Sequence, residues 1–135
     1  ITVKLDLSKN LILSGYENEL NQALLNILNN SKDALKETHK DDRYVFIKSY
    51  ENQNKIVIEI IDNAGGVPQE IIQKVFEPYF TTKHKSQGTG LGLYMTHKII
   101  NESMKGEIRI SNISTIIDSK KFDKCAKVTI TLPIS

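Results

Sequence analysis

Residues 55–68, KIVIEIIDNAGGVP, contain the transition that decides the fold. The first eight are rich in Ile and Val, which is typical of a buried β-strand, and the strand ends at Asp62 before two glycines. The apolar run YVFIKSY occupies 44–50, and the turn-prone ENQN at 51–54 separates the two runs. The two runs are therefore predicted to form a β-hairpin that delivers Asp62 to the edge of the core.

The Asp62 carboxylate allows two readings. A carboxylate at the edge of a core costs free energy unless something hydrogen-bonds it. The amino group of adenine would satisfy it and would discriminate against guanine, which has a carbonyl in that place. The alternative is an ordinary Asp at a strand-to-turn junction, followed by glycines that only supply backbone geometry. The motif taken alone favours neither.

Working outward, hydrophobic periodicity predicts the remaining elements. They are a strand ITVKLDL at 1–7, a short apolar stretch LILSG at 11–15, a helix from about Glu17 to Thr38, a short helix at 68–76, a helix from Leu91 to Met104 buried on two sides, and strands at 106–113 and 126–133. The stripe of the long helix comprises Leu20, Leu24, Ile27, Leu28, Ser31 and Leu35. This order indicates an α+β fold with a mixed sheet covered on one face by about three helices.

A polar stripe runs along one flank of the long helix. Glu19, Asn26, Asn30 and Asp33 fall within about 60° of one another on a helical wheel. A solvated flank is the simplest reading. However, Asn is a mediocre helix former in a helix interior, and a carboxamide can offer its oxygen to Mg²⁺ and its NH₂ group to a phosphate.

The segment FEPYFTTKHKSQGTGLGL at 76–93 suggests a phosphate site. Gly88, Gly90 and Gly92 alternate just before a predicted helix, where free backbone N–H groups and the helix dipole favour phosphate. The stretch 77–90 shows no periodicity and is unusually long for a connection, and it carries Lys83 and Lys85 as cations. A lid that orders over a triphosphate explains these features, and a disordered surface loop is the alternative.

Length and composition limit the remaining possibilities. The chain has 135 residues, enough for a single domain spanning 1–135, with 39% apolar residues, 25% charged residues and a net charge of +2. The scattered charges do not indicate nucleic acid as a partner, and the single Cys125 excludes an internal disulfide. No apolar run is long enough to cross a membrane, and no P-loop or strand-linked dinucleotide motif is present. Without an initiator Met, the chain is interpreted as a fragment of a longer protein.

Taken in order, these motifs resemble the catalytic domains of sensor histidine kinases, within the wider family that includes DNA gyrase, Hsp90 and MutL. NILNN at 26–30 is similar to the N box, and DNAGGV at 62–67 to the first glycine box. FEPYFTTK at 76–83 is similar to the F box, and GTGLGL at 88–93 to the second glycine box. The resemblance implies a two-layer α/β sandwich of the Bergerat type, with about five strands and an ATP site between helices and sheet.

The resemblance also implies roles for individual residues. Asn30 would ligand Mg²⁺, Asn26 would assist at the phosphates, Asp62 would bind the adenine amino group, and Gly66 would shape the turn under the base. Lys83 would reach the phosphates. The catalytic residues would therefore be Asn26, Asn30 and Lys83. The second glycine box would cradle the phosphates and the F-box aromatic residues would hold the lid, which adds Phe76, Tyr79, Phe80, Thr82, Gly88, Thr89, Gly90, Leu91 and Gly92.

Three positions depart from the family pattern. Ala64 stands where glycine is frequent, and Asp33 stands where many members carry Lys, which puts a phosphate contact there in doubt. Cys125 and Ala126 replace a frequent Gly-Thr pair, which puts an adenine-side contact in doubt.

Asn26 favours a kinase over an ATPase. Relatives that hydrolyse ATP carry a water-activating Glu at this place, and an amide cannot accept a proton at neutral pH. A neutral imidazole acceptor depends far less on such a base, so Mg²⁺ and cations around the γ-phosphate would suffice. His39, His84 and His97 each precede Lys, unlike the acceptor of the family, and His97 is predicted to be a surface or packing residue.

The expected partners are therefore a histidine-bearing dimerisation domain of the same kinase and a response regulator, in two-component signal transduction in the cytoplasm. No nucleic-acid partner and no membrane contact by this fragment are expected. An anti-sigma type serine kinase, an ATP-hydrolysing relative and a non-enzymatic nucleotide-binding module remain as alternatives.

Overall fold

The structure is a computed structural model and describes residues 1–8, 17–38, 42–78, 92–117 and 119–134. The elements, in chain order, are β1 (Thr2–Leu7), α1 (Glu17–Glu37), β2 (Tyr44–Asn52), β3 (Lys55–Asp62), the 3₁₀-helix η1 (Gln69–Lys74), α2 (Gly92–Lys98), the π-helical turn η2 (Ile99–Ser103), β4 (Glu107–Ile117) and β5 (Lys120–Pro133). The predicted apolar stretch at 11–15 lies outside the described residues.

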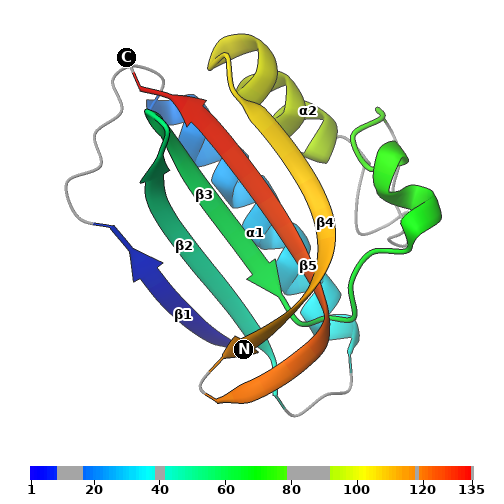
Figure 1. The fold of residues 1–135 in the computed structure, drawn as a ribbon. Helices are drawn as coiled ribbons and strands as arrows, with labels where there is room; N and C mark the ends of the chain where they lie inside the picture. Colours follow the sequence, from blue (N-terminus) through cyan, green and yellow to red (C-terminus); the bar gives the residue numbers. More distant parts are fainter. Residues whose placement is uncertain (9–16, 39–41, 79–91, 118, 135) are drawn as a thin grey trace.

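A single five-stranded sheet carries the fold, in the order β1-β2-β3-β5-β4. β1 pairs with β2 in parallel and all other neighbours are antiparallel, so the sheet is mixed, as predicted. Figure 1 shows α1 and α2 on the same face of the sheet, with η1 beyond the β4 edge. The α+β sandwich expected from the sequence is therefore confirmed.

The apolar stripe of α1 supplies one side of the core. Ile27 and Leu35 are almost fully buried, and Ser31 between them is 5% exposed. The opposing layer comes from alternate residues of the sheet, Val45, Ile60, Ile108, Ile130 and Leu132. Burying these side chains contributes about 1.5–3 kcal/mol each, which outweighs the mediocre helix propensity of the asparagines on the α1 flank.

The predicted hairpin of β2 and β3 is confirmed. Gln53 and Asn54 form its two-residue turn, with φ values of 53° and 62°. Positive φ at both central residues is the geometry of a type I′ turn, which matches the twist of the flanking strands. The hairpin fixes the register Val45↔Asp62, so Asp62 is the last paired residue of β3.

Four predicted elements differ from the structure. The strands predicted at 106–113 and 126–133 are longer and join as a single hairpin, because β4 continues to Ile117 and β5 begins at Lys120. The helix predicted at 68–76 is the 3₁₀-helix Gln69–Lys74, and Pro68 precedes it.

The helix predicted from Leu91 to Met104 is not one regular helix. Its α-helical part ends at Lys98, and Ile99–Ser103 forms a π-helical turn in which the Met104 N–H bonds to the Ile99 carbonyl at 3.0 Å. This extra residue per turn rotates the following side chains. Ile100 is buried, but Met95, which belongs to one of the two apolar sides predicted to be buried, is 47% exposed, so that prediction is wrong for Met95.

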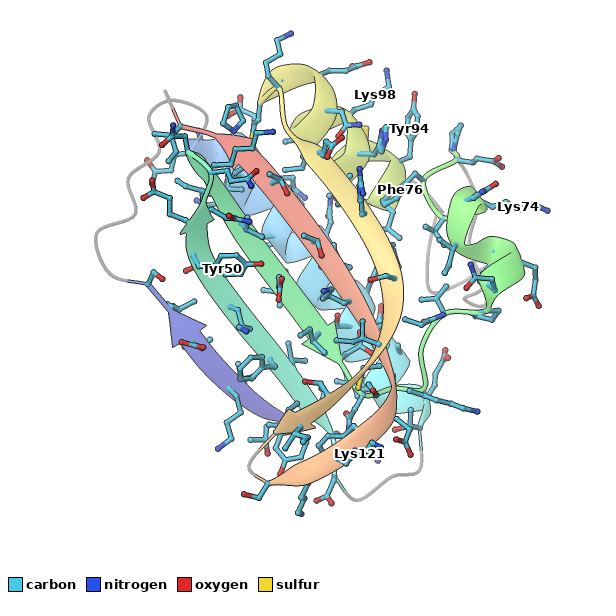
Figure 2. All side chains as sticks on the ribbon, in the orientation of Figure 1. Tyr50, Lys74, Phe76, Tyr94, Lys98 and Lys121 are labelled. Atoms are coloured by element: carbon cyan, nitrogen blue, oxygen red, sulfur yellow. The ribbon has the colours of Figure 1, made fainter. Side chains whose placement is uncertain are left out.

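The other face of the sheet is largely polar. Tyr50 lies across this face (Figure 2), where its hydroxyl donates a 2.6 Å hydrogen bond to Glu59 on β3. The Lys127 ammonium lies 4.0 Å from the same carboxylate. The helices therefore cover the sheet on one side only, and Asp62 lies on that side at the end of β3.

Candidate functional site

Asp62 is the most deeply buried carboxylate at the end of the sheet. It closes β3, and its register Asp62↔Ala126 with β5 orients its side chain toward the helical layer, on the face shared by Ile58 and Ile60. It is 8% exposed. The Ala64 N–H donates to its Oδ1 at 3.1 Å, and the Ser31 hydroxyl of α1 donates a further hydrogen bond. The prediction that Asp62 emerges at the edge of the core is confirmed.

Burial is the main influence on the Asp62 carboxyl. Loss of hydration raises the pKa of Asp62 above its ordinary value of 3.8, and the hydrogen bonds from Ala64 and Ser31 act in the opposite direction. A carboxylate can accept about four hydrogen bonds, and two donors are identified here. Asp62 thus combines a raised pKa with capacity for a further donor, which is the pattern expected of a binding group.

The turn after Asp62 has a backbone conformation that glycine makes possible. Gly65 and Gly66 have φ values of 115° and 81°, a region that other residues rarely adopt. The prediction that Gly66 shapes this turn agrees with its conformation. Ala64 stands just before the pair and is only partly buried.

Two asparagines anchor this turn, and no role was predicted for either of them from the sequence. Asn63 is 1% exposed; its Oδ1 accepts the Tyr44 N–H at 2.8 Å and its Nδ2 donates to the Asp42 carbonyl at 2.9 Å. Asn112 on β4 bonds both backbone groups of Val67, at 2.7 and 2.6 Å. A polar residue at the end of a predicted strand was the only sequence signal available for Asn112.

Asn26 connects the two helices of the site. Its Nδ2 donates to the Thr96 hydroxyl at 3.1 Å and lies 3.3 Å from the Gly92 carbonyl. The Gln22 side chain donates to its Oδ1 at 3.0 Å, which fixes the orientation of the amide. Gly92 is the first residue of α2, so Asn26 holds the beginning of the helix that follows the glycine-rich segment.

A short stretch of α1 therefore connects the two ends of the candidate site. Ser31 bonds Asp62 at the end of β3, and Asn26, five residues earlier, bonds the carbonyl of Gly92 in the first turn of α2. Five helical residues span about 7.5 Å along the axis. Asn30 lies between these two contacts and is half-buried, as is Asp33 one turn later.

A bound Mg²⁺ would depend on the nucleotide for most of its ligands. In the described part of the chain, no three His, Cys, Asp or Glu side chains gather closely enough to hold a metal ion. Mg²⁺ commonly keeps several waters and binds through one or two protein oxygens together with substrate phosphates. The single amide oxygen of Asn30 fits that kind of site and does not fit a dedicated protein cage.

Most predicted lid and phosphate residues lie outside the described residues. These are Tyr79, Phe80, Thr82, Lys83, Gly88, Thr89, Gly90 and Leu91. Phe76, at the beginning of this motif, packs against the core and against the ring of His97, with centroids 5.1 Å apart. His97 also contacts the Asn101 amide at 3.1 Å, so the prediction of a surface or packing residue for His97 agrees with its position.

The departures at Cys125 and Ala126 lie beside Asp62. Cys125 is fully buried, and Ala126 pairs directly with Asp62 across the sheet.

None of the described helices has the length and apolar character that a membrane crossing requires.

Comparison with known proteins identifies one family over most of the chain. The family described as histidine kinase-, DNA gyrase B- and HSP90-like ATPases matches residues 15–135. Sporulation kinase B of Bacillus subtilis is 32% identical over 133 residues, which are 98% of this chain and 28% of that protein. The histidine-protein kinase AtoS of Escherichia coli is 37% identical over 95 residues, which are 70% of this chain and 14% of AtoS. The chain thus spans less than a third of either relative.

Solved structures show the same fold. The nucleotide-free catalytic domain of the histidine kinase ThkA superposes with a TM-score of 0.78 at 24% identity, covering 98% of this chain and 78% of that one. Full-length ShkA in complex with AMPPNP superposes with a TM-score of 0.75 at 18% identity, covering 99% of this chain and 26% of ShkA.

Proposed function

This chain belongs to the family of histidine kinase-, DNA gyrase B- and HSP90-like ATPases, and we propose that it binds Mg²⁺-ATP and transfers the γ-phosphoryl group to a histidine on a separate domain. The matched relatives are sensor kinases of greater length, which supports assigning the acceptor histidine to another part of the parent protein. ATP and Mg²⁺ are the proposed cofactors.

The buried carboxylate of Asp62 is the observation that carries the proposal. It lies at the covered edge of the sheet with two donors already in place and capacity for another. The exocyclic amino group of adenine is a donor of the right kind, whereas guanine would present a carbonyl oxygen to the carboxylate. Asp62 therefore selects adenine over guanine.

The phosphates extend from Asp62 along α1 toward α2. Asn30 lies between the contacts that α1 makes with Asp62 and with the first turn of α2, so its amide oxygen would be suited to hold a Mg²⁺ ion beside the phosphates. A bound Mg²⁺ would supply charge neutralisation at the transferred phosphoryl group. Lys83 and the glycines of 88–92 complete the phosphate contacts in this proposal.

The chemistry of Asn26 favours a kinase. Its amide donates to Thr96 and accepts from Gln22, so it serves as a connector between helices. An amide has no basic site for a proton from water, and the ATPase alternative lacks its base at this position. A neutral imidazole on a partner domain brings its own lone pair.

Two-component signalling supplies the remaining proposals. A histidine-bearing dimerisation domain of the same kinase would accept the phosphoryl group, and a response regulator would receive it next. The names of the curated relatives support this assignment, and the proposed location is the cytoplasm.

Phosphotransfer in trans tests the function. The chain is mixed with γ-labelled ATP, Mg²⁺ and the histidine-bearing segment of its parent protein, with a His→Gln variant of that segment as the control. We expect label on the segment alone, lost in acid and retained in base. Acid-stable label would indicate the serine-kinase alternative, and rapid ATP turnover by the chain itself, abolished by Asn26→Ala, would indicate an ATPase.

A further inference from the structure

We propose that Asn112 is a positioning residue that fixes the base end of the nucleotide site. It acts through the turn at Gly66 and Val67 and does not need to touch the nucleotide. This inference rests on the proposed function, because the turn matters only if the base binds beside Asp62.

The Asn112 side chain binds Val67 as a neighbouring strand would. Its Oδ1 accepts the Val67 N–H at 2.7 Å, and its Nδ2 donates to the Val67 carbonyl at 2.6 Å. A primary amide offers one acceptor and two donors, so one side chain reproduces both bonds of a strand pair. Val67 is thereby tied to β4, although its segment belongs to no strand.

Gly66 fits closely under the same amide. A Cβ atom added to Gly66 would lie 2.8 Å from the Asn112 Oδ1, closer than real Cβ contacts allow. Its φ of 81° adds backbone strain for any other residue. The glycine and the asparagine therefore depend on each other, because the amide occupies the space that glycine leaves.

Asp62 and Asn112 also belong to one row across the sheet. Asp62 pairs with Ala126, and Ala126 pairs with Asn112, so all three side chains lie on the face that the helices cover. Two strand spacings separate Asp62 from Asn112 by about 10 Å. The small Ala126 lies between them, with the Asp62 carboxylate at one end of the row and the Asn112 amide at the other.

Asn112 does not belong to the hydrophobic core, so its role can be tested apart from core packing. Asn112 is exposed, and the register of β4 shifts just beyond it, between Ile113 and Thr115. Irregularities of this kind redirect side chains near binding sites. Truncating Asn112 therefore removes few apolar contacts, and its main expected effect is on the conformation of the turn.

Calorimetric titration of the chain with Mg²⁺-ATP and with metal-free adenosine tests this inference. We expect Asn112→Ala to raise the Kd of both ligands by a similar factor, about five- to tenfold, because the loss lies at the base. Asn112→Asp should also weaken both, because it keeps the acceptor but sets an oxygen against the Val67 carbonyl. Ser114→Ala, at an exposed position on the same strand, is the matched control and should leave both Kd values unchanged.

A stability cycle adds a readout that does not involve nucleotide. Gly66→Ala should cost less stability in the Asn112→Ala background than in the unchanged chain, because the clash with Oδ1 is gone. Unchanged Kd values in both Asn112 variants, or additive effects in the cycle, would overturn the inference alone. Failure of the unchanged chain to bind Mg²⁺-ATP would overturn the proposed function and this inference with it.

Discussion

The amide of Asn26 on α1 donates a 3.1 Å hydrogen bond to the hydroxyl of Thr96 on α2. Thr96 is fully buried, and its hydroxyl donates in turn to the Gly92 carbonyl at 2.8 Å. A buried polar group that loses its partner costs more than the bond itself contributed. The pair therefore fixes the first turn of α2 against the helix that carries Asn30.

Thr96→Val is expected to remove the hydrogen bond between α1 and α2 while preserving the size of the side chain. It should lower the free energy of unfolding by about 1–3 kcal/mol, because the Asn26 amide loses a buried partner. It should also weaken Mg²⁺-ATP binding. Urea denaturation and calorimetry measure the two effects, and Thr96→Ser is the control, since it keeps the hydroxyl and should retain ATP affinity.

Asp62→Asn is expected to weaken ATP binding and to stabilise the fold. It should weaken ATP binding about ten- to 150-fold, the loss typical of a hydrogen bond to a charged group. It should stabilise the fold at pH 7, because it removes a carboxylate that is 8% exposed. Calorimetry and denaturation of the same samples measure both, and unchanged ATP affinity would remove Asp62 from the site.

The difference in the free energy of unfolding between the unchanged chain and Asp62→Asn should depend on pH. Burial raises the folded-state pKa of Asp62 above 3.8, so ionisation of Asp62 costs stability at neutral pH. As the pH falls through the raised pKa, the folded carboxyl becomes neutral, and below 3.8 both states are neutral. The advantage of Asp62→Asn should therefore shrink as the pH falls through the raised pKa toward 3.8, and an advantage independent of pH would contradict this account.

Asn30→Ala is expected to affect the metal end of the site. It should weaken Mg²⁺-ATP binding much more than binding of metal-free adenosine, because the amide oxygen is proposed to contact only the metal. Titration calorimetry with the two ligands measures the difference. Equal losses for both ligands would indicate that Asn30 supports the pocket, and Asn29→Ala, at an exposed neighbouring position, is the matched control.

Tyr50 should titrate late. Its hydrogen bond to Glu59, together with burial and the Glu59 charge, raises the pKa of Tyr50 from 10.0 to about 12. Its contribution to stability is fully present below pH 10 and is lost as the pH rises through about 12. Ultraviolet titration should show a phenol ionising near pH 12 that disappears in Tyr50→Phe, while ATP affinity stays unchanged, because Tyr50 lies on the opposite face of the sheet.

The sequence by itself determined the long helix α1, the β2–β3 hairpin and the faces that they bury. Period-2 and helical patterns depend on local backbone geometry, so they placed α1, the β2–β3 hairpin and Asp62 at the core edge. The motif order also identified the family that the comparison found over residues 15–135.

Only the tertiary structure decided which polar groups meet. Asn26 and Thr96 are 70 residues apart, and Val67 and Asn112 are 45 apart, so no local pattern connects them. The π-helical turn after Lys98, which changes the direction of the side chains that follow it, and the exposure of Met95, which periodicity predicted as buried, are both features of the packed structure. Periodicity reports the direction of a side chain, whereas its partner depends on how distant elements pack, and here that packing joins α1, α2 and β4 around Asp62.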